Sequence, residues 1–214
     1  MADILNDLKD MVTNFDVDNA ENIAKKAIEE GVDPLQAAKA LTEAIRQVGE
    51  KFGKGELFLP DLVCASEVLK KSFPIINAEI EKKGKKQESL GKVIIGTVFG
   101  DIHSIGKGMI STLLYASGFE VIDLGVNVKA ETFLKKIKEE NPDILAMSAL
   151  LTTTAQEQKN VIEGLKKQDL RNKVKVIVGG SPINQEFADS IGADGYGSTA
   201  PEGVKVAKRL LGIK

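Results

Sequence analysis

The chain has 214 residues, which is enough for one large domain or two small ones. Its 29 basic and 31 acidic residues give a net charge of −2, so it lacks the strong basic field that holds nucleic acid or an anionic membrane. No apolar stretch approaches the roughly 20 residues of a membrane helix, and the first residues lack the pattern of a signal peptide. The single cysteine, Cys64, cannot form an internal disulfide, and we therefore expect a cytoplasmic protein.

The first part of the chain predicts four amphipathic helices. Apolar residues recur at helical spacing from Ile4 to Val12, Ala20 to Ile28, Leu35 to Val48 and Leu62 to Ile80. Pro74 predicts a kink or a local break in the last of these helices. Helices of this kind with short connections favour a four-helix bundle, which we assign to residues 1–88.

A charged segment follows the bundle. Residues 82–92 read KKGKKQESLGK and show no apolar periodicity. We interpret them as a solvated linker between domains, with a docking patch for a partner protein as the alternative.

Short β-branched runs alternate with helical stretches in residues 89–214. The runs cover 92–98, 120–125, 143–150 and 175–180, with a weaker one at 193–197, and helices are expected near 106–117, 130–140, 155–167, 184–191 and 201–211. Such alternation predicts an α/β domain with a parallel sheet covered on both faces. Five units fit a flavodoxin-like, that is Rossmann-like, doubly wound fold.

The loop after the first predicted strand carries the only histidine of the chain. Asp101 and His103 are two residues apart and lie between Gly100 and Gly106. If the strand order is 2-1-3-4-5, this loop faces the loop after the third strand, where ligands bind in such sheets. An Asp that accepts a hydrogen bond from one imidazole nitrogen leaves the other nitrogen free as a base or a metal ligand. A capping Asp beside a chance His is the alternative.

Two further loops end at the same edge of the predicted sheet. The loop after the third strand runs from Ser148 through Leu150 to Thr152, Thr153 and Thr154, and these threonines can serve simply as helix N-caps. The loop after the fourth strand contains Gly179 and Gly180, which can form an ordinary turn. Neither loop indicates a binding site by itself, but their position together with the histidine loop at one edge of the sheet does.

Together the three loops resemble a known signature. Asp101-x-His103-x-x-Gly106, Ser148-x-Leu150 and Gly179-Gly180, separated by 41 and 28 residues, are similar to the cobalamin-binding motif of B12-dependent methyltransferases and mutases. The motif also occurs in the cobalamin-binding module of methionine synthase. Over essentially its whole length, the chain resembles the small corrinoid proteins of methylamine, methanol and glycine betaine methyltransferase systems.

The resemblance implies a role for each motif residue. His103 is expected to be the lower axial ligand of cobalt, with Asp101 bonded to its other ring nitrogen and the hydroxyl of Thr154 extending that relay. Cobalamin-dependent methionine synthases have a serine at the position of Thr154. The displaced nucleotide tail is expected to enter a slot lined by Ser148 and Leu150, with clearance provided by Gly179 and Gly180. The remaining implied cofactor contacts are Ser104, Ile105, Gly106 and Thr152.

The helical bundle matches the methyl-transfer branch of this family, in which it caps the upper face of cobalt. Phe58 is expected to be the apolar lid, with Leu62 or Val63 beside it. The alternative is that Phe58 belongs to the bundle core. We interpret Cys64, next on the same helix, as a small buried apolar residue and not a nucleophile.

The resemblance implies a corrinoid methyl carrier with no catalytic residues of its own. A substrate-specific methyltransferase would methylate Co(I), and a second methyltransferase would pass the group from methyl-Co(III), the methylcobalamin state, to coenzyme M or tetrahydrofolate. A reductive activation protein is a further expected partner, in methanogenesis or other one-carbon metabolism. The compact length slightly favours a methylamine system.

Three alternatives share parts of the pattern. A cobalamin-dependent mutase subunit has the same motif, but we would expect no dedicated helical cap. A cobalamin-sensing regulatory module would normally add a DNA-binding unit, for which this chain has no room. A phospho-receiver would need an acidic cluster after its first strand, where this chain has Gly100, Asp101 and a histidine.

Overall fold

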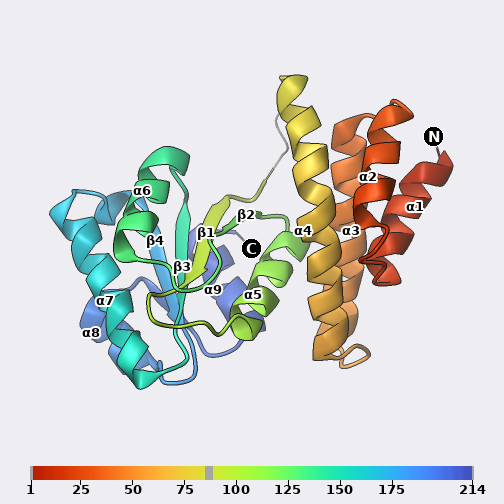
Figure 1. Cartoon of the computed structure of the whole chain (residues 1–214). Coiled ribbons are helices and arrows are strands. Elements are labelled where there is room, and N and C mark those ends of the chain that lie inside the picture. Colours follow the sequence, from red (N-terminus) through yellow and green to blue (C-terminus); the bar gives the residue numbers. More distant parts are fainter. Residues whose placement is uncertain (1, 85–88, 214) are drawn as a thin grey trace. The chain divides into compact units, whose positions relative to one another are not determined.

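The computed structural model describes residues 2–84 and 89–213 and divides into two compact units (Figure 1). One unit comprises Met1–Ser89 with Tyr115–Gly118, and the other comprises Leu90–Leu114 with Phe119–Lys214. The predicted boundary at residue 88, like the middle of the charged segment, lies outside the described residues. Within the described ranges, none of the helices combines the length and the apolar character needed to cross a membrane.

The first unit contains the four predicted helices. They are α1 (Ala2–Thr13), α2 (Ala20–Glu29), α3 (Pro34–Gly53) and α4 (Leu59–Lys82). Most of the apolar positions that predicted them are buried, as Leu8 and Leu41 illustrate with 0% exposure, whereas Ile28 and Leu35 are partly buried. Helix α3 begins where Asp33 accepts a hydrogen bond from the amide of Leu35 at 3.2 Å, ahead of a proline in the first helical turn.

The break considered at Pro74 is absent, because α4 continues through this residue. A proline removes one hydrogen bond from the helix interior. The side chains on either side of it, Phe73 and Ile76, are 6% and 0% exposed. Their burial in the bundle therefore holds both halves of α4 in one helix.

The second unit confirms the predicted doubly wound fold. Its five parallel strands have the order β2-β1-β3-β4-β5. They are β1 (Lys92–Thr97), β2 (Glu120–Asp123), β3 (Ile144–Ser148), β4 (Lys175–Gly179) and β5 (Gly195–Gly197). The helices are α5 (Ile105–Ala116), α6 (Ala130–Glu140), α7 (Thr152–Lys167), α8 (Gln185–Ile191) and α9 (Ala200–Leu210), with a short 3₁₀ turn at Arg171–Lys173 that the sequence pattern did not predict.

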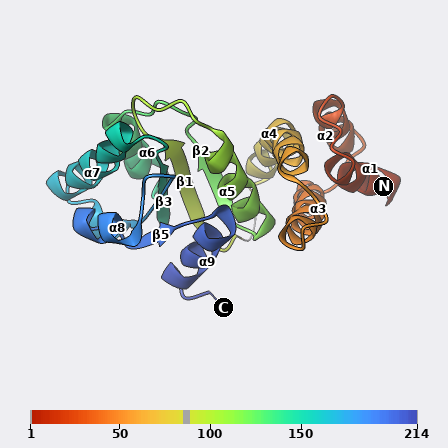
Figure 2. The same cartoon turned by 90° about the horizontal axis from the view of Figure 1, so that it is seen from below.

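The sheet lies between two layers of helices. Helices α5 and α9 cover one face, and α6, α7 and α8 cover the other (Figure 2). On the latter face, Phe133, Leu145 and Ile162 form part of one continuous apolar core and are fully buried. This two-sided burial explains why β1 and β3 read as apolar runs and not as alternating patterns.

Candidate functional site

The strand register brings the predicted loops together at the carboxyl edge of the sheet. Thr97, the last residue of β1, pairs with Ser148 of β3, and Ser148 pairs with Gly179 of β4. The loops that follow these three strands therefore start side by side. This is the switch point at which the strand order reverses between β1 and β3.

Asp101 is the centre of a polar network in these loops. Its side chain is completely buried and accepts four hydrogen bonds. The oxygen Oδ1 accepts from the amide of His103 at 3.0 Å and from the ring nitrogen Nδ1 of the same residue at 2.7 Å. The oxygen Oδ2 accepts from the amide of Leu150 at 2.7 Å and from the hydroxyl of Thr154 at 2.8 Å. The carboxylate thus links the loops after β1 and β3.

These donors determine the charge of Asp101. Burial raises the pKa of the carboxyl group, but the hydrogen bonds from Leu150, His103 and Thr154 outweigh it and hold the pKa well below its usual range. An ionised carboxylate only accepts hydrogen bonds, so Nδ1 of His103 must carry the proton. A neutral imidazole in this tautomer has its lone pair on Nε2. Nε2 has no hydrogen-bond partner among the described residues, and the His103 side chain is 48% exposed.

The backbone of the histidine loop is fixed as well. The buried hydroxyl of Thr97 donates to the carbonyl of His103 at 2.9 Å, and the amide of Asp101 donates to the carbonyl of Val98 at 3.2 Å. The ring of His103 is therefore held in place both by its own fixed backbone and by its hydrogen bond to Asp101. Such a ring can offer its exposed nitrogen to a metal without further rearrangement.

Thr154 occupies two of the predicted roles at once. Helix α7 begins at Thr152, earlier than the expected start near residue 155, so Thr154 lies in its first turn. Its hydroxyl accepts a 3.3 Å hydrogen bond from the amide of Leu151, as a capping residue does, and donates to Asp101. Thr152 is exposed and caps nothing. Thr154 therefore caps the start of α7 and also bonds the carboxylate of Asp101.

Exposed apolar side chains gather in the loops around His103. Ile102 and Ile105 are 74% and 61% exposed, and Leu150 is 41% exposed beside the carboxylate of Asp101. Val126 and Leu151, in the loops after β2 and β3, are also exposed. Ile102, Val126 and Leu151 were not predicted as site residues, and the only available signal was an apolar residue in a loop directly after a buried strand. Such a group on a soluble protein indicates a surface that another molecule covers.

Comparisons with known proteins agree with this geometry. Two family models, each described as a B12 binding domain, match residues 91–205 and 4–77. The chain is 43% identical over 212 residues to a trimethylamine corrinoid protein from Methanosarcina barkeri, covering 99% of this chain and 98% of that protein. The chain belongs to the family of B12-binding corrinoid proteins.

Solved structures show the same likeness. The Methanosarcina barkeri monomethylamine corrinoid protein is 32% identical with a TM-score of 0.55, covering 98% of this chain and 99% of that one. The methanol:cobalamin methyltransferase complex from Methanosarcina barkeri matches with 28% identity and a TM-score of 0.80, covering 98% of this chain and 80% of that one.

The residues of this corrinoid protein fit its cofactor, which is cobalamin or a related corrinoid. The lone pair of His103 lies on an exposed nitrogen, and apolar side chains suited to an extended macrocycle surround it. Ser104, Ile105 and Gly106 are all exposed in the same loop and the start of α5. A Cβ added to Gly106 would meet no atom within 4 Å, and the residue has no left-handed backbone. Nothing in the described part of the chain therefore requires glycine at this position.

Gly180 needs glycine for a reason within the chain itself, which is separate from the predicted clearance for a nucleotide tail. Gly180 has a φ of +131°, and a Cβ there would lie 1.7 Å from the carbonyl oxygen of Ala149. A Cβ at Gly179 would lie 3.0 Å from the carbonyl oxygen of Gly197. The corrinoid protein's own backbone therefore excludes a side chain at Gly180, whether or not a nucleotide tail passes nearby. Any larger residue there would disturb the end of β3 before it affected a ligand.

The bundle residues predicted to lie near the upper face differ in exposure. Phe58, the residue before α4, is 72% exposed, so it is not part of the bundle core. Leu62 is 1% exposed and packs inside the bundle, whereas Val63 is 38% exposed. Of the two neighbours considered for Phe58, the burial pattern favours Val63. Cys64 is only partly buried, contrary to the expectation that it would be buried.

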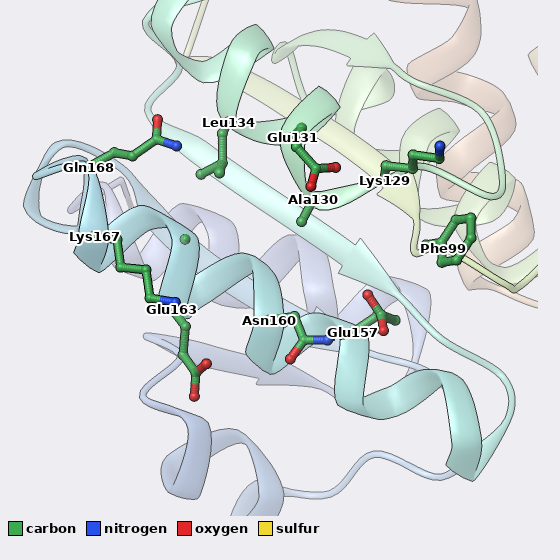
Figure 3. A pocket seen from close by; sticks show the side chains of 11 residues that line it. Phe99, Lys129, Ala130, Glu131, Leu134, Glu157, Asn160, Glu163, Lys167 and Gln168 are labelled. Carbon is green, nitrogen blue, oxygen red and sulfur yellow. Dashed lines mark hydrogen bonds between the residues drawn. The ribbon is translucent and has the colours of Figure 1, made fainter.

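A separate pocket of about 660 Å³ runs between α6 and α7 (Figure 3). Lys129 and Phe99 lie near one end of it, Lys167 and Gln168 lie near the other, and Glu131, Glu157 and Glu163 line it as well. It contains none of the predicted cofactor contacts. Its mixed charge matches no single class of ligand.

Proposed function

We propose that this corrinoid protein carries methyl groups between two methyltransferases and that its methyl donor is a methylamine. The bound corrinoid supplies the cobalt atom on which the methyl group travels. The full-length similarity to a trimethylamine corrinoid protein supports the donor class. A matching structure described as a methanol:cobalamin methyltransferase complex supports a methyltransferase as a partner. Both matches favour this function over a mutase subunit or a cobalamin-sensing module.

One observation carries the proposal: the buried carboxylate of Asp101 bonds Nδ1 of His103 and leaves Nε2 exposed among apolar side chains. In this arrangement His103 would hold the cobalt of the bound corrinoid through Nε2, as its lower ligand. Asp101 and Thr154 keep the ring in the tautomer that ligation needs.

The other loops hold the remainder of the cofactor. Ser148 and Leu150 line the slot for the nucleotide tail, and Gly179 and Gly180 form its backbone wall. The exposed start of α5 contacts the corrin through Ser104, Ile105 and Gly106, and Thr152 contacts it from the start of α7. On the bundle, Phe58 with Val63 beside it covers the upper face and keeps water from the methyl group.

The partners follow from the carrier role. A methylamine-specific methyltransferase loads the methyl group, and a second methyltransferase removes it to coenzyme M or tetrahydrofolate. A reductive activation protein restores carriers whose cobalt has been oxidised. None of these steps needs a catalytic residue from the carrier, which binds the cofactor, orients it and presents it.

Electron paramagnetic resonance tests the role of His103 directly, because the chain contains one histidine. The tag-free protein is loaded with cobalamin and reduced to Co(II). An axial nitrogen splits each cobalt line into three, and labelling histidine with nitrogen-15 should reduce the three lines to two. Labelling lysine with nitrogen-15 is the control and should leave three lines. Splitting that ignores the histidine label would show that another nitrogen binds the metal.

The donor class is tested with purified methyltransferases specific for trimethylamine, dimethylamine, monomethylamine and methanol. Each is mixed with the reduced, cobalamin-loaded protein and its own substrate, and methylation is followed by absorbance. We expect at least one methylamine enzyme to methylate the carrier much faster than the methanol enzyme does. Faster methylation by the methanol enzyme would contradict the proposed donor.

A further inference from the structure

The loop after β2 contacts the histidine loop more closely than the motif predicts. The amide of Asn127 donates to the carbonyl of Asp101 at 2.9 Å, and its side-chain oxygen Oδ1 accepts from the amide of Gly100 at 2.8 Å. One residue therefore bonds two consecutive positions of the histidine loop. Neither the predicted motif nor the cofactor contacts include Asn127.

The backbone shapes of both loops depend on this contact. Gly100 has a φ of +79° and Asn127 has a φ of +55°, so both occupy the left-handed region. Asparagine is among the few residues with a side chain that adopt this region readily. The same two loops are joined by the pairing of Val98 with Val128, which brings Asn127 within reach of Gly100. Asn127 thus supplies both a left-handed turn and an acceptor.

Fixing Gly100 and Asp101 also fixes the imidazole. Asp101 is bonded through its amide to Val98, through its carbonyl to Asn127 and through its carboxylate to His103. A shift of the Asp101 backbone would move the carboxylate and, with it, the ring of His103. A metal ligand held in place beforehand binds more tightly than one that must be ordered at the moment of binding.

We propose that Asn127 is a positioning residue for His103, holding the histidine loop in the shape that presents Nε2 to the cobalt of the corrinoid. This inference rests on the proposed role of His103 as the lower axial ligand. Asn127 itself does not contact the metal. It acts through Gly100 and Asp101.

Two substitutions separate the two properties of Asn127. Asn127→Gly keeps the left-handed backbone at no steric cost but removes the acceptor for the Gly100 amide. Asn127→Asp keeps an acceptor and tolerates the same backbone. Asn141→Gly is the matched control, because Asn141 is also exposed and left-handed, with a φ of +46°, but ends α6 at the far end of that helix.

The affinity for cobinamide is the measurement. Cobinamide lacks the nucleotide tail, so its binding depends on the histidine and the corrin contacts alone. We expect Asn127→Gly to raise its Kd about 2- to 5-fold, the effect of one net hydrogen bond near the surface. Asn127→Asp and Asn141→Gly should leave the Kd within error of the parent. In a His103→Ala background, the effect of Asn127→Gly should disappear, because there is no ring left to position.

The outcomes distinguish failure of this inference from failure of the proposed function. If His103→Ala binds cobinamide as tightly as the parent, His103 is not a ligand and the proposed function fails at that point. If His103→Ala weakens binding but Asn127→Gly does not, the positioning role is wrong. It is also wrong if Asn127→Gly has the same effect in both backgrounds, or if Asn141→Gly has an equal effect.

Hydrogen exchange of the cofactor-free protein gives a second measurement. The Gly100 amide should exchange faster in Asn127→Gly than in the parent, and Asn127→Asp should restore its protection. Unchanged exchange in Asn127→Gly would show that the contact does not hold the loop, and would overturn the inference without any use of the cofactor.

Discussion

The histidine loop and the turn before α4 each present a ring that the proposed function needs, but they hold it differently. His103 is 48% exposed, and its ring is bonded to a carboxylate that accepts four hydrogen bonds. Phe58 is 72% exposed, and only its backbone is fixed, with its amide donating to Asp61 at 2.8 Å. Its ring has no aromatic or cation–π partner among the described residues.

This difference follows from what each ring must do. A metal ligand needs one nitrogen at one place, and hydrogen bonds are directional enough to specify it. An apolar cover only has to exclude water, for which burial without a fixed direction is sufficient. We therefore expect substitutions in the polar network to have large effects on stability, and substitutions of the apolar residues at the site to have small ones.

The largest effect is expected at Lys107, next to Gly106, which is a proposed cofactor contact at the start of α5. Lys107 is 4% exposed and forms an ion pair with Asp123 at the end of β2. Lys107→Ala removes the ion-pair partner of the Asp123 carboxylate, which keeps its hydrogen bond from the amide of Gly125, and should lower the free energy of unfolding by about 3–5 kcal/mol. Urea denaturation of the cofactor-free protein measures this change. The double variant Lys107→Met with Asp123→Asn removes the charge on both sides and should recover much of the loss.

Asp101→Asn is expected to have the next largest effect. An amide presents one oxygen and one NH₂ group, so it cannot accept hydrogen bonds from both His103 and the Leu150–Thr154 side. We expect a loss of about 2–4 kcal/mol in the free energy of unfolding. A loss below about 0.5 kcal/mol, the size of an ordinary surface effect, would contradict the central place of Asp101 in the network.

The same variant should change the dependence of stability on pH. The pKa of Asp101 is lowered in the folded state, so the unfolded state binds a proton first as the pH falls. The stabilisation is therefore complete above the unfolded pKa of about 3.9 and is lost progressively below it. Denaturation at a series of pH values from about 7 to about 3 should show a steeper loss of stability below about pH 4 in the parent than in Asp101→Asn.

The sequence predicted the strand order, the helix count of the bundle and the pairing of Asp101 with His103, because each depends on local pattern or on a short motif. It did not predict the role of Asn127 or the contact that excludes a side chain at Gly180. The partner of the Asn127 side chain lies 27 residues away in another loop, and the atom that excludes a side chain at Gly180 belongs to Ala149, directly after the neighbouring strand β3. Contacts of this kind depend on the register between strands, which no local pattern fixes.

The difference between Leu62 and Val63 has a similar origin. Successive residues of a helix point about 100° apart, so an error of one position moves a side chain from the core to the surface. The apolar pattern of α4 admitted both residues as neighbours of Phe58. Only the packing of the bundle buries Leu62 and exposes Val63.

Gly106→Ala separates stability from binding at the apolar side of the site. The added methyl group meets no atom of the described residues within 4 Å, and alanine is favoured over glycine in a helix by up to about 1 kcal/mol. We expect unchanged or slightly higher stability, with cobalamin affinity lowered about 10-fold by overlap with the cofactor. Equilibrium dialysis measures the affinity. Gly180→Ala is the contrasting variant. It should lower the stability of the cofactor-free protein, because its Cβ meets the backbone of Ala149.

The smallest effect on stability is expected for Phe58→Ala. Because the ring is 72% exposed and the Phe58 backbone keeps its hydrogen bond with Asp61, the free energy of unfolding should change by less than about 0.5 kcal/mol. If the ring covers the upper face of the cofactor, however, the protein loaded with methylcobalamin should lose its methyl group faster under light and in water. Photolysis followed by absorbance measures this rate, and the rate for Phe58→Leu, which keeps an apolar side chain, should lie between those of the parent and Phe58→Ala.

Phe52, which is partly buried on α3, offers the matched control. Phe52→Ala should lower stability more than Phe58→Ala does, while leaving the photolysis rate unchanged. Equal photolysis rates in the parent and Phe58→Ala, with normal cobalamin binding in both, would remove Phe58 from the cap and leave the turn before α4 without a role toward the cofactor.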